Sequence, residues 1–483
     1  MTSAYDAVAY PAATFPQTHP DRLALIARLH GLAAPAVERA RVLEIGGGDG
    51  FNAIALAAAF PDARFLSFDF SAAAVARGQA LVAASGMDNV RIELADILNF
   101  ARTVEPGGFD YVIAHGVYAW VPGAVREAVL VLAGRALSDE GVFFVSYNTL
   151  PGGHVRQVMR EMLTHELNGV EGIEARMAAA RAVLEDYAAL RSGDDAVVSA
   201  IRAQAVAMLT RPDSVLFHDE LGDVFAPQSL TRTVEASARQ GLEFLDDSGK
   251  GRLGDGFLSD EATPEADAST AAIVRAAQSR DFAEMRFFRQ NLYVRAGRKP
   301  ARRPAHEAVR ACYAAGQFAP GGDGAIVSAD TTFALRDAKL QAWLLALGER
   351  WPRHRRVDAI ADTPERCEAL YRLFAMGVLH LSTVPPPFVL EPGDIPRSSP
   401  LVLAQLALGH PTVTTLHFEK MRLKDPAARG LLACLDGTLD RAALAVRWAQ
   451  LAHAPGIDLA AALDTIAAQR LLLPGAPTGL KQR

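Results

Sequence analysis

Three glycines and three acidic residues have the types and the spacing to hold a ligand. Gly46, Gly48 and Gly50 follow a mainly apolar stretch at 42–45, and a helix is expected at 53–60. Because glycine lacks a side chain, the backbone there can approach a ligand closely. The start of a helix adds unbonded N–H groups and a partial positive charge. Three carboxylates add hydrogen-bond acceptors: Glu44, Asp69 and Asp96.

One histidine and two tyrosines could take part in catalysis: His115, Tyr118 and Tyr147. The imidazole could act as a general base or line the ligand. Lining is favoured, and a ring that only bonds the backbone is the structural alternative. Nearby aromatic residues could form a channel that excludes water and holds a cation, although each could equally pack in a core. The candidate channel residues are Tyr5, Tyr10, Phe15, Trp120 and His154.

Apolar strands alternate with helices through the first third of the chain. The expected strands are 41–46, 63–69, 90–94, 109–115 and 141–147. Such repeats predict a parallel sheet with helices on both faces. Ligands of these sheets bind beyond the carboxyl ends of the strands. That edge carries Gly46, Asp69, Asp96, His115 and Tyr147.

The composition excludes several classes of protein. A net charge of −6 and 22% charged residues do not indicate a nucleic-acid-binding surface, and the arginine clusters at 299–303 and 353–356 are interpreted as solvated faces. No signal peptide and no apolar stretch of about 20 residues is found, so no membrane partner is expected. The 3 cysteines form no CxxC pair, which indicates free thiols, no metal and a cytoplasmic location.

The glycine spacing distinguishes two classes of cofactor. Dinucleotide enzymes use G-x-G-x-x-G, and here the third glycine comes one residue too early. Glu44-x-Gly46-x-Gly48-x-Gly50 resembles the first motif of class I S-adenosylmethionine (SAM) methyltransferases. The resemblance implies that Asp69 accepts hydrogen bonds from the ribose hydroxyls and that Asp96 accepts one from the adenine amine, with Ile97 near the ring. Taken singly, each acid could instead be a helix cap or a surface residue.

The full set of expected SAM-binding residues extends beyond this motif. Gln17 and His19 could contact the methionine end of the cofactor or cap the helix that follows them. The set is Gln17, His19, Glu44, Gly46, Gly48, Gly50, Asn52, Asp69, Phe70, Asp96, Ile97, His115 and Gly116.

Further segments resemble bacterial methyltransferases that carry a methyltransferase regulatory domain, a group that includes rickettsial protein-lysine methyltransferases. The matching segments are SAYD at 3–6, YP at 10–11, FPQTHPDR at 15–22, IAHGVYAWVP at 113–122, SYNTLPGGH at 146–154, FHDEL at 217–221, FRQ at 288–290 and LDGTLDR at 435–441. The resemblance implies SAM as cofactor, a protein lysine amine as acceptor and a homodimer. A small-molecule N- or O-methyltransferase and a non-catalytic SAM-binding regulatory protein remain alternatives.

The chain of 483 residues is long enough for several domains. Residues 1–34 are expected to form an arm and helix that act as a flap over substrate and cofactor. Residues 35–297 are expected to form a Rossmann-like α/β methyltransferase domain with a helical insertion at 155–213. A winged-helix-like region at 298–388, with helices at 337–351, 357–360 and 364–376, and a mainly helical region at 389–483 complete the prediction.

Overall fold

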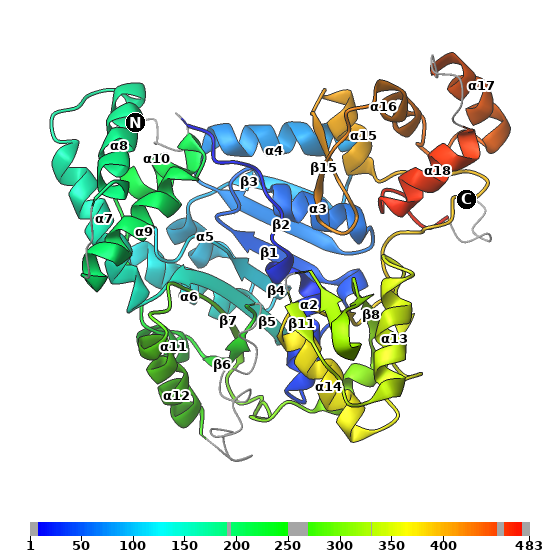
Figure 1. The fold of residues 1–483 in the computed structure, drawn as a ribbon. Helices are drawn as coiled ribbons and strands as arrows, with labels where there is room; N and C mark the ends of the chain where they lie inside the picture. The colour runs from blue at the N-terminus through cyan, green and yellow to red at the C-terminus, as the bar shows by residue number, and fades with distance from the viewer. Residues whose placement is uncertain (1–7, 191–194, 250–268, 330, 452–457, 476–483) are drawn as a thin grey trace.

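A seven-stranded sheet forms the centre of the molecule (Figure 1). The computed structural model describes residues 8–190, 195–249, 269–329, 331–451 and 458–475. The strand order is β3-β2-β1-β4-β5-β7-β6, with β1 to β5 parallel and β7 antiparallel to both of its neighbours. The strands are β1 (Arg41–Ile45), β2 (Arg64–Asp69), β3 (Val90–Leu94), β4 (Phe109–Ala114), β5 (Leu137–Asn148), β6 (Leu242–Asp247) and β7 (Phe288–Arg295). The predicted Rossmann-like α/β class is confirmed.

Helices cover both faces of the sheet because successive strand residues point to opposite sides. Val42 packs in one core and Leu43 in the other. The first core includes residues of α2 (Pro20–Leu29), α3 (Phe51–Ala59) and α4 (Ala72–Ser85). The second includes residues of α5 (Ile97–Thr103), α6 (Gly123–Ala136), α11 (Leu230–Ala238) and α12 (Thr270–Ala283). The short helices η1 (Pro16–Thr18) and η2 (Val37–Arg39) flank α2.

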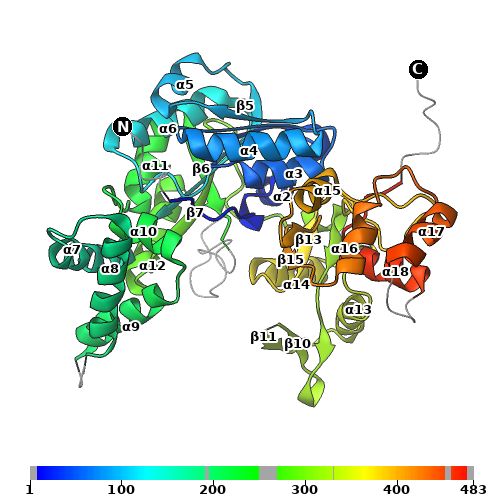
Figure 2. The ribbon, with the colours of Figure 1, turned by 90° about the horizontal axis from the view of Figure 1, so that it is seen from above.

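Four helices lie between β5 and α11 and pack around an apolar cluster of their own. They are α7 (Gly152–Glu166), α8 (Ile173–Ala188), α9 (Ala196–Leu209) and α10 (Asp213–Leu221). Figure 2 shows this helical group and the C-terminal helices on opposite sides of the sheet. The alternation of strand and helix therefore stops after β5, as the sequence indicates.

Residues 298–388 contain short strands and two longer helices. They are η3 (His306–Ala311), β8 (Tyr313–Ala315), β9 (Ala319–Pro320), η4 (Gly322–Gly324), β10 (Ile326–Ser328), β11 (Thr331–Phe333), α13 (Ala338–Gly348), β12 (Arg355–Arg356), α14 (Pro364–Ala375) and β13 (His380–Ser382). The helix expected at 357–360 is wrong. Ile360 and Ala361 both donate to the Val357 carbonyl in a single turn, and Thr363 then caps α14.

The interpretation of the arginine clusters as solvated faces is wrong for Arg302, whereas Lys299 and Arg303 beside it are exposed. Arg302 is buried and donates to the Phe244 carbonyl and the Glu243 carboxylate, which compensates its charge. His354 is only partly accessible and packs against other histidine rings. Arg353 and Arg356, in contrast, are exposed. The segment after residue 296 is thus anchored to the sheet domain.

The C-terminal part packs against the sheet domain through α15, which contacts α3 and α4. Its elements are α15 (Pro400–Ala407), β14 (Thr412–Thr414), β15 (Lys420–Arg422), α16 (Pro426–Ala433), α17 (Arg441–Leu451) and α18 (Leu459–Ala468). The hairpin of β14 and β15 extends toward α3 (Figures 1 and 2). Among the described helices, none has the length and apolarity needed to cross a membrane.

Candidate functional site

The turn between β1 and α3 requires its glycines. Gly46, Gly48 and Gly50 have φ values of 63°, 62° and 67°, a region that side chains disfavour. A Cβ atom at Gly46 would lie 2.6 Å from Val117 Cγ2, and one at Gly50 would lie 2.3 Å from Ile92 Cδ1. The turn therefore brings bare backbone to the carboxyl end of β1, at the point where the strand order reverses between β1 and β4.

Asp69 ends β2 beside this turn. Its Oδ2 accepts from the Gly48 N–H at 2.9 Å, and its Oδ1 accepts from the Ser71 N–H at 2.9 Å. These two bonds fix the carboxylate next to the glycines, where it remains half-buried. The structure thus brings together the predicted acid and the predicted turn.

Glu44 is buried beneath the glycine turn. Its two carboxylate oxygens accept from Asn52 Nδ2 and Ser67 Oγ, each at 2.8 Å. Burial raises the pKa of Glu44 to about 6. A Cβ atom at Gly47 would lie 2.6 Å from Glu44 Oε2 and 2.1 Å from Ser67 Oγ. Glu44 therefore braces the turn, and Gly47, which lies outside the spaced-glycine motif, is required by this packing.

Replacing Glu44 with alanine should lower the free energy of unfolding by about 2 to 5 kcal/mol, because two buried donors lose their acceptor. Chemical denaturation of the variant measures this change. The control is Glu38→Ala, since Glu38 is exposed on η2. Equal stability of the two variants would contradict the bracing role.

The acid after β3 is exposed. Asp96 caps α5 through a bond from the Asn99 N–H at 3.1 Å, and Ile97 is half-buried beside it. Phe70 follows Asp69 with 56% of its surface exposed. Asp96 is thus a helix cap and also lies at the same sheet edge as Asp69.

His115 lies just past β4 and contacts both the sheet and the N-terminal arm. Its Nδ1 is 2.7 Å from Ser146 Oγ, which also accepts from the Gly116 N–H at 2.9 Å. Burial lowers the pKa of His115 to about 4, so the ring is neutral at pH 7. The Phe15 ring packs 4.1 Å from it, centroid to centroid. A neutral ring with so low a pKa suits a lining role better than that of a general base.

The structure does not bring the two candidate tyrosines to His115. The ring centroids of Tyr118 and Tyr147 lie 5.7 Å apart in the second core. Tyr147 OH accepts from Asn291 Nδ2 at 2.8 Å. Tyr147 points to the face opposite Ser146, its neighbour in β5. Burial raises the pKa of Tyr118 to about 12 and also raises the pKa of Tyr147. Both phenols therefore stay protonated at pH 7.

The expected channel residues do not form one surface. Tyr10 is exposed and contacts the His218 ring, while His154 is exposed on α7. Trp120 packs on Phe225, and its ring is covered by the guanidinium groups of two arginines: Arg156 and Arg160, at 5.0 and 5.6 Å. Phe15 packs on His115 at the end of β4. Tyr5 lies outside the described residues.

Gln17 and His19 lie on either side of Thr18, which accepts from Asn52 at the start of α3. His19 caps α2 by accepting from the Asp21 N–H at 3.2 Å, and its ring contacts Phe60 at the far end of α3. Both residues line a cavity of about 440 Å³. Three further histidines line it: His354, His380 and His417. No local sequence pattern indicates this group, because its members come from distant segments.

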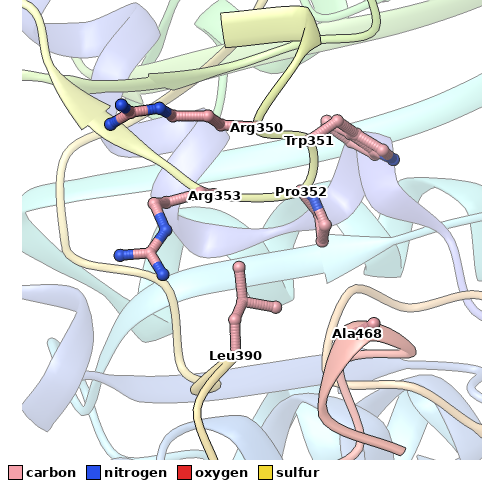
Figure 3. A pocket seen from close by; sticks show the side chains of 6 residues that line it. All are labelled: Arg350, Trp351, Pro352, Arg353, Leu390 and Ala468. Carbon is pink, nitrogen blue, oxygen red and sulfur yellow. The ribbon is translucent and has the colours of Figure 1, made fainter. Parts of the chain in front are cut away.

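A more open hollow of about 490 Å³ lies between the segment after α13 and the end of α18 (Figure 3). Figure 3 shows Arg350 and Arg353 extending to one side and Trp351 to the other. The remaining lining residues are Pro352, Leu390 and Ala468. None of the predicted site residues lies here. Within the described part of the chain, no group of three or more potential ligands could hold a metal ion.

Comparison with known families settles the class of the sheet domain. A family model described as "Methyltransferase domain" matches residues 37–185, which contain the glycine turn and all three candidate acids. The chain is a SAM-dependent methyltransferase. A "Predicted methyltransferase regulatory domain" matches residues 212–295 of the enzyme. A "PKMT, C-terminal winged helix domain" matches residues 394–471, whereas the winged-helix-like region was expected at 298–388. The boundaries between the domains stay a prediction.

The methyltransferase is similar to two uncharacterised proteins of Rickettsia prowazekii. It is 29% identical to RP028 over 242 residues, which cover 50% of this chain and 96% of the relative. It is 30% identical to RP789 over 289 residues, which cover 60% of this chain but only 52% of the relative. The chain thus matches about half the length of the second relative.

Two solved structures share the fold over nearly the whole chain. PKMT2 from Rickettsia typhi matches with a TM-score of 0.79 and 22% identity, covering 96% of this chain and 100% of PKMT2. The same protein in complex with AdoHcy matches with a TM-score of 0.76, 22% identity and coverage of 96% and 99%. The methyltransferase therefore shares the fold of that protein over 96% of this chain.

Proposed function

We propose that this methyltransferase transfers the methyl group of SAM to the side-chain amine of a lysine in a protein. The observation that carries the proposal is the C-terminal match to the PKMT winged-helix domain, an element that methyl transfer to a small molecule does not require. The fold shared with PKMT2 along both whole chains supports it. A homodimer and a cytoplasmic location stay predictions from the sequence.

The strand edge offers a position for each part of the cofactor. The bare backbone from Gly46 to Gly50 would lie against the amino-acid end of SAM, and the Asp69 carboxylate would accept from the ribose hydroxyls. Asp96 would accept from the adenine amine, with Phe70 and Ile97 beside the ring. The geometric support is the shared sheet edge and the fixed orientation of Asp69 against the turn.

Methyl transfer needs a neutral amine in line with the sulfonium group. The nitrogen lone pair forms the new N–C bond as the C–S bond breaks, and the released electron pair leaves AdoHcy as a neutral thioether. His115, with a pKa of about 4, is too weak a base to deprotonate a lysine at pH 7, and the tyrosines remain protonated. None of these three groups is a base for the amine at pH 7, so the proposed proton acceptor is water, and burial of the lysine would favour the loss of the proton.

Incubation of the enzyme with tritium-labelled SAM and a cell lysate, followed by separation of proteins from small molecules, tests the proposal. Label is expected in the protein fraction, and more of it as the pH rises toward the lysine pKa. Label in small molecules alone would show that the acceptor is a small molecule and not a protein. Label in neither fraction would contradict catalysis.

A further inference from the structure

The N-terminal arm, residues 8–18, lies across the edge of the sheet where the cofactor is expected (Figure 1). The Phe15 N–H donates to Asn52 Oδ1 at 3.0 Å, and Asn52 Nδ2 donates to Thr18 Oγ1 at 3.2 Å. The Phe15 ring packs against His115 at the end of β4. The arm is thus bound both to the start of α3 and to the end of β4, the two elements that flank the site.

One end of the arm is held by α10. His218 Nε2 donates to the Val8 carbonyl at 2.7 Å, and the rings of His218 and Tyr10 lie 5.6 Å apart. His218 is buried and belongs to the segment that matches the regulatory domain. The arm therefore has an attachment outside the sheet on this side.

The middle of the arm is held by the hairpin of β14 and β15. Thr14 Oγ1 donates to the Phe418 carbonyl at 2.6 Å, and Lys420 Nζ donates to the Ala12 carbonyl. The Lys420 ammonium also lies 5.3 Å from the centroid of the Phe51 ring, in the first residue of α3. This hairpin belongs to the segment that matches the winged-helix domain.

We infer that Thr14 and Lys420 are positioning residues that hold the arm over the cofactor, so that the winged-helix domain sets the affinity for SAM. Apart from the three-residue η1, the arm has no secondary structure, so an unattached arm would lose conformational freedom each time it closed over a ligand. Contacts from the hairpin order the arm before the cofactor binds. Less conformational entropy is then lost on binding, which strengthens the binding of SAM. The inference rests on the proposed SAM site and not on the identity of the acceptor.

Calorimetric titration of the full-length protein with SAM tests this role. Lys420→Ala should raise the Kd for SAM roughly tenfold, as the loss of one charged hydrogen bond would. Thr14→Val, a milder change, should raise it by a smaller factor. The turnover rate at saturating SAM should stay unchanged, because the arm closes once the cofactor is bound. Lys420→Arg should restore binding, since the guanidinium can reach the same carbonyl.

Lys424→Ala is the matched control, because Lys424 is exposed two residues beyond β15. A Kd for Lys420→Ala and Thr14→Val equal to that of the control would overturn the inference. So would a fall in turnover at saturating SAM without a change in Kd. Failure of the wild-type protein to bind SAM would instead refute the cofactor site itself.

Discussion

Asp69→Ala is expected to weaken SAM binding by roughly a hundredfold or more. The carboxylate would accept two ribose hydrogen bonds, each worth about 1.5 to 3 kcal/mol when the acceptor is charged, and about 1.4 kcal/mol corresponds to tenfold in affinity. Its orientation is already fixed by the N–H groups of Gly48 and Ser71. Calorimetric titration with SAM measures the loss.

The control for this variant is Asp88→Ala. Asp88 is exposed before β3, where it makes a surface ion pair of 3.7 Å with Arg64, so its loss should leave SAM affinity unchanged. Asp69→Asn should fall between the two, because the amide oxygen can still accept. Equal affinities of the two alanine variants would contradict the proposed place of the ribose.

Acidification from pH 6.5 toward pH 4 should strongly destabilise the folded protein. Burial lowers the pKa values of His19, His115 and His354 to about 4 and that of His417 to about 3. In this pH range the unfolded chain binds protons that the folded chain does not, so stability falls as the pH falls. A shift from 6.5 to 4 is worth about 3 kcal/mol for each histidine.

The cavity histidines also share one environment, which strengthens the effect. His354, His380 and His417 lie with ring centroids 5.3 to 6.4 Å apart, and Arg22 and Arg470 further oppose their protonation. Urea denaturation at pH 6.5 and pH 4.5 measures the change.

Replacing His380 and His417 with glutamine should reduce the pH dependence, because an amide takes up no proton in this range. The exposed His410 offers a matched control as His410→Gln. An equal reduction of the pH dependence in the control and in the double variant would contradict the role of the cavity histidines.

The sequence predicted the sheet and its ligand-binding edge because both depend on local patterns. Strand periodicity located β1 to β5, and the spacing of Gly46, Gly48 and Gly50 located the turn. Because side chains alternate along a strand, Tyr147 points to the face opposite Ser146 and so away from His115. The prediction nevertheless placed Tyr147 and His115 at one site. Local pattern was therefore enough for the scaffold of the site.

Contacts between distant segments could not be predicted in this way. Lys420 Nζ donates to the carbonyl of Ala12, 408 positions away in the sequence, and Thr14 Oγ1 donates to that of Phe418, 404 positions away. Such pairs follow from how the C-terminal part packs on α3 and α4, which no local pattern encodes. The same reason explains why the cavity histidines were missed.

The most direct test of the account is amino-acid analysis of proteins labelled by this enzyme with tritiated SAM. After complete acid hydrolysis, the label should elute with the methylated lysines, and a parallel reaction with Asp69→Ala should give almost none. Label in any other amino acid, or no label in protein with the wild-type enzyme, would contradict a SAM-dependent protein-lysine methyltransferase.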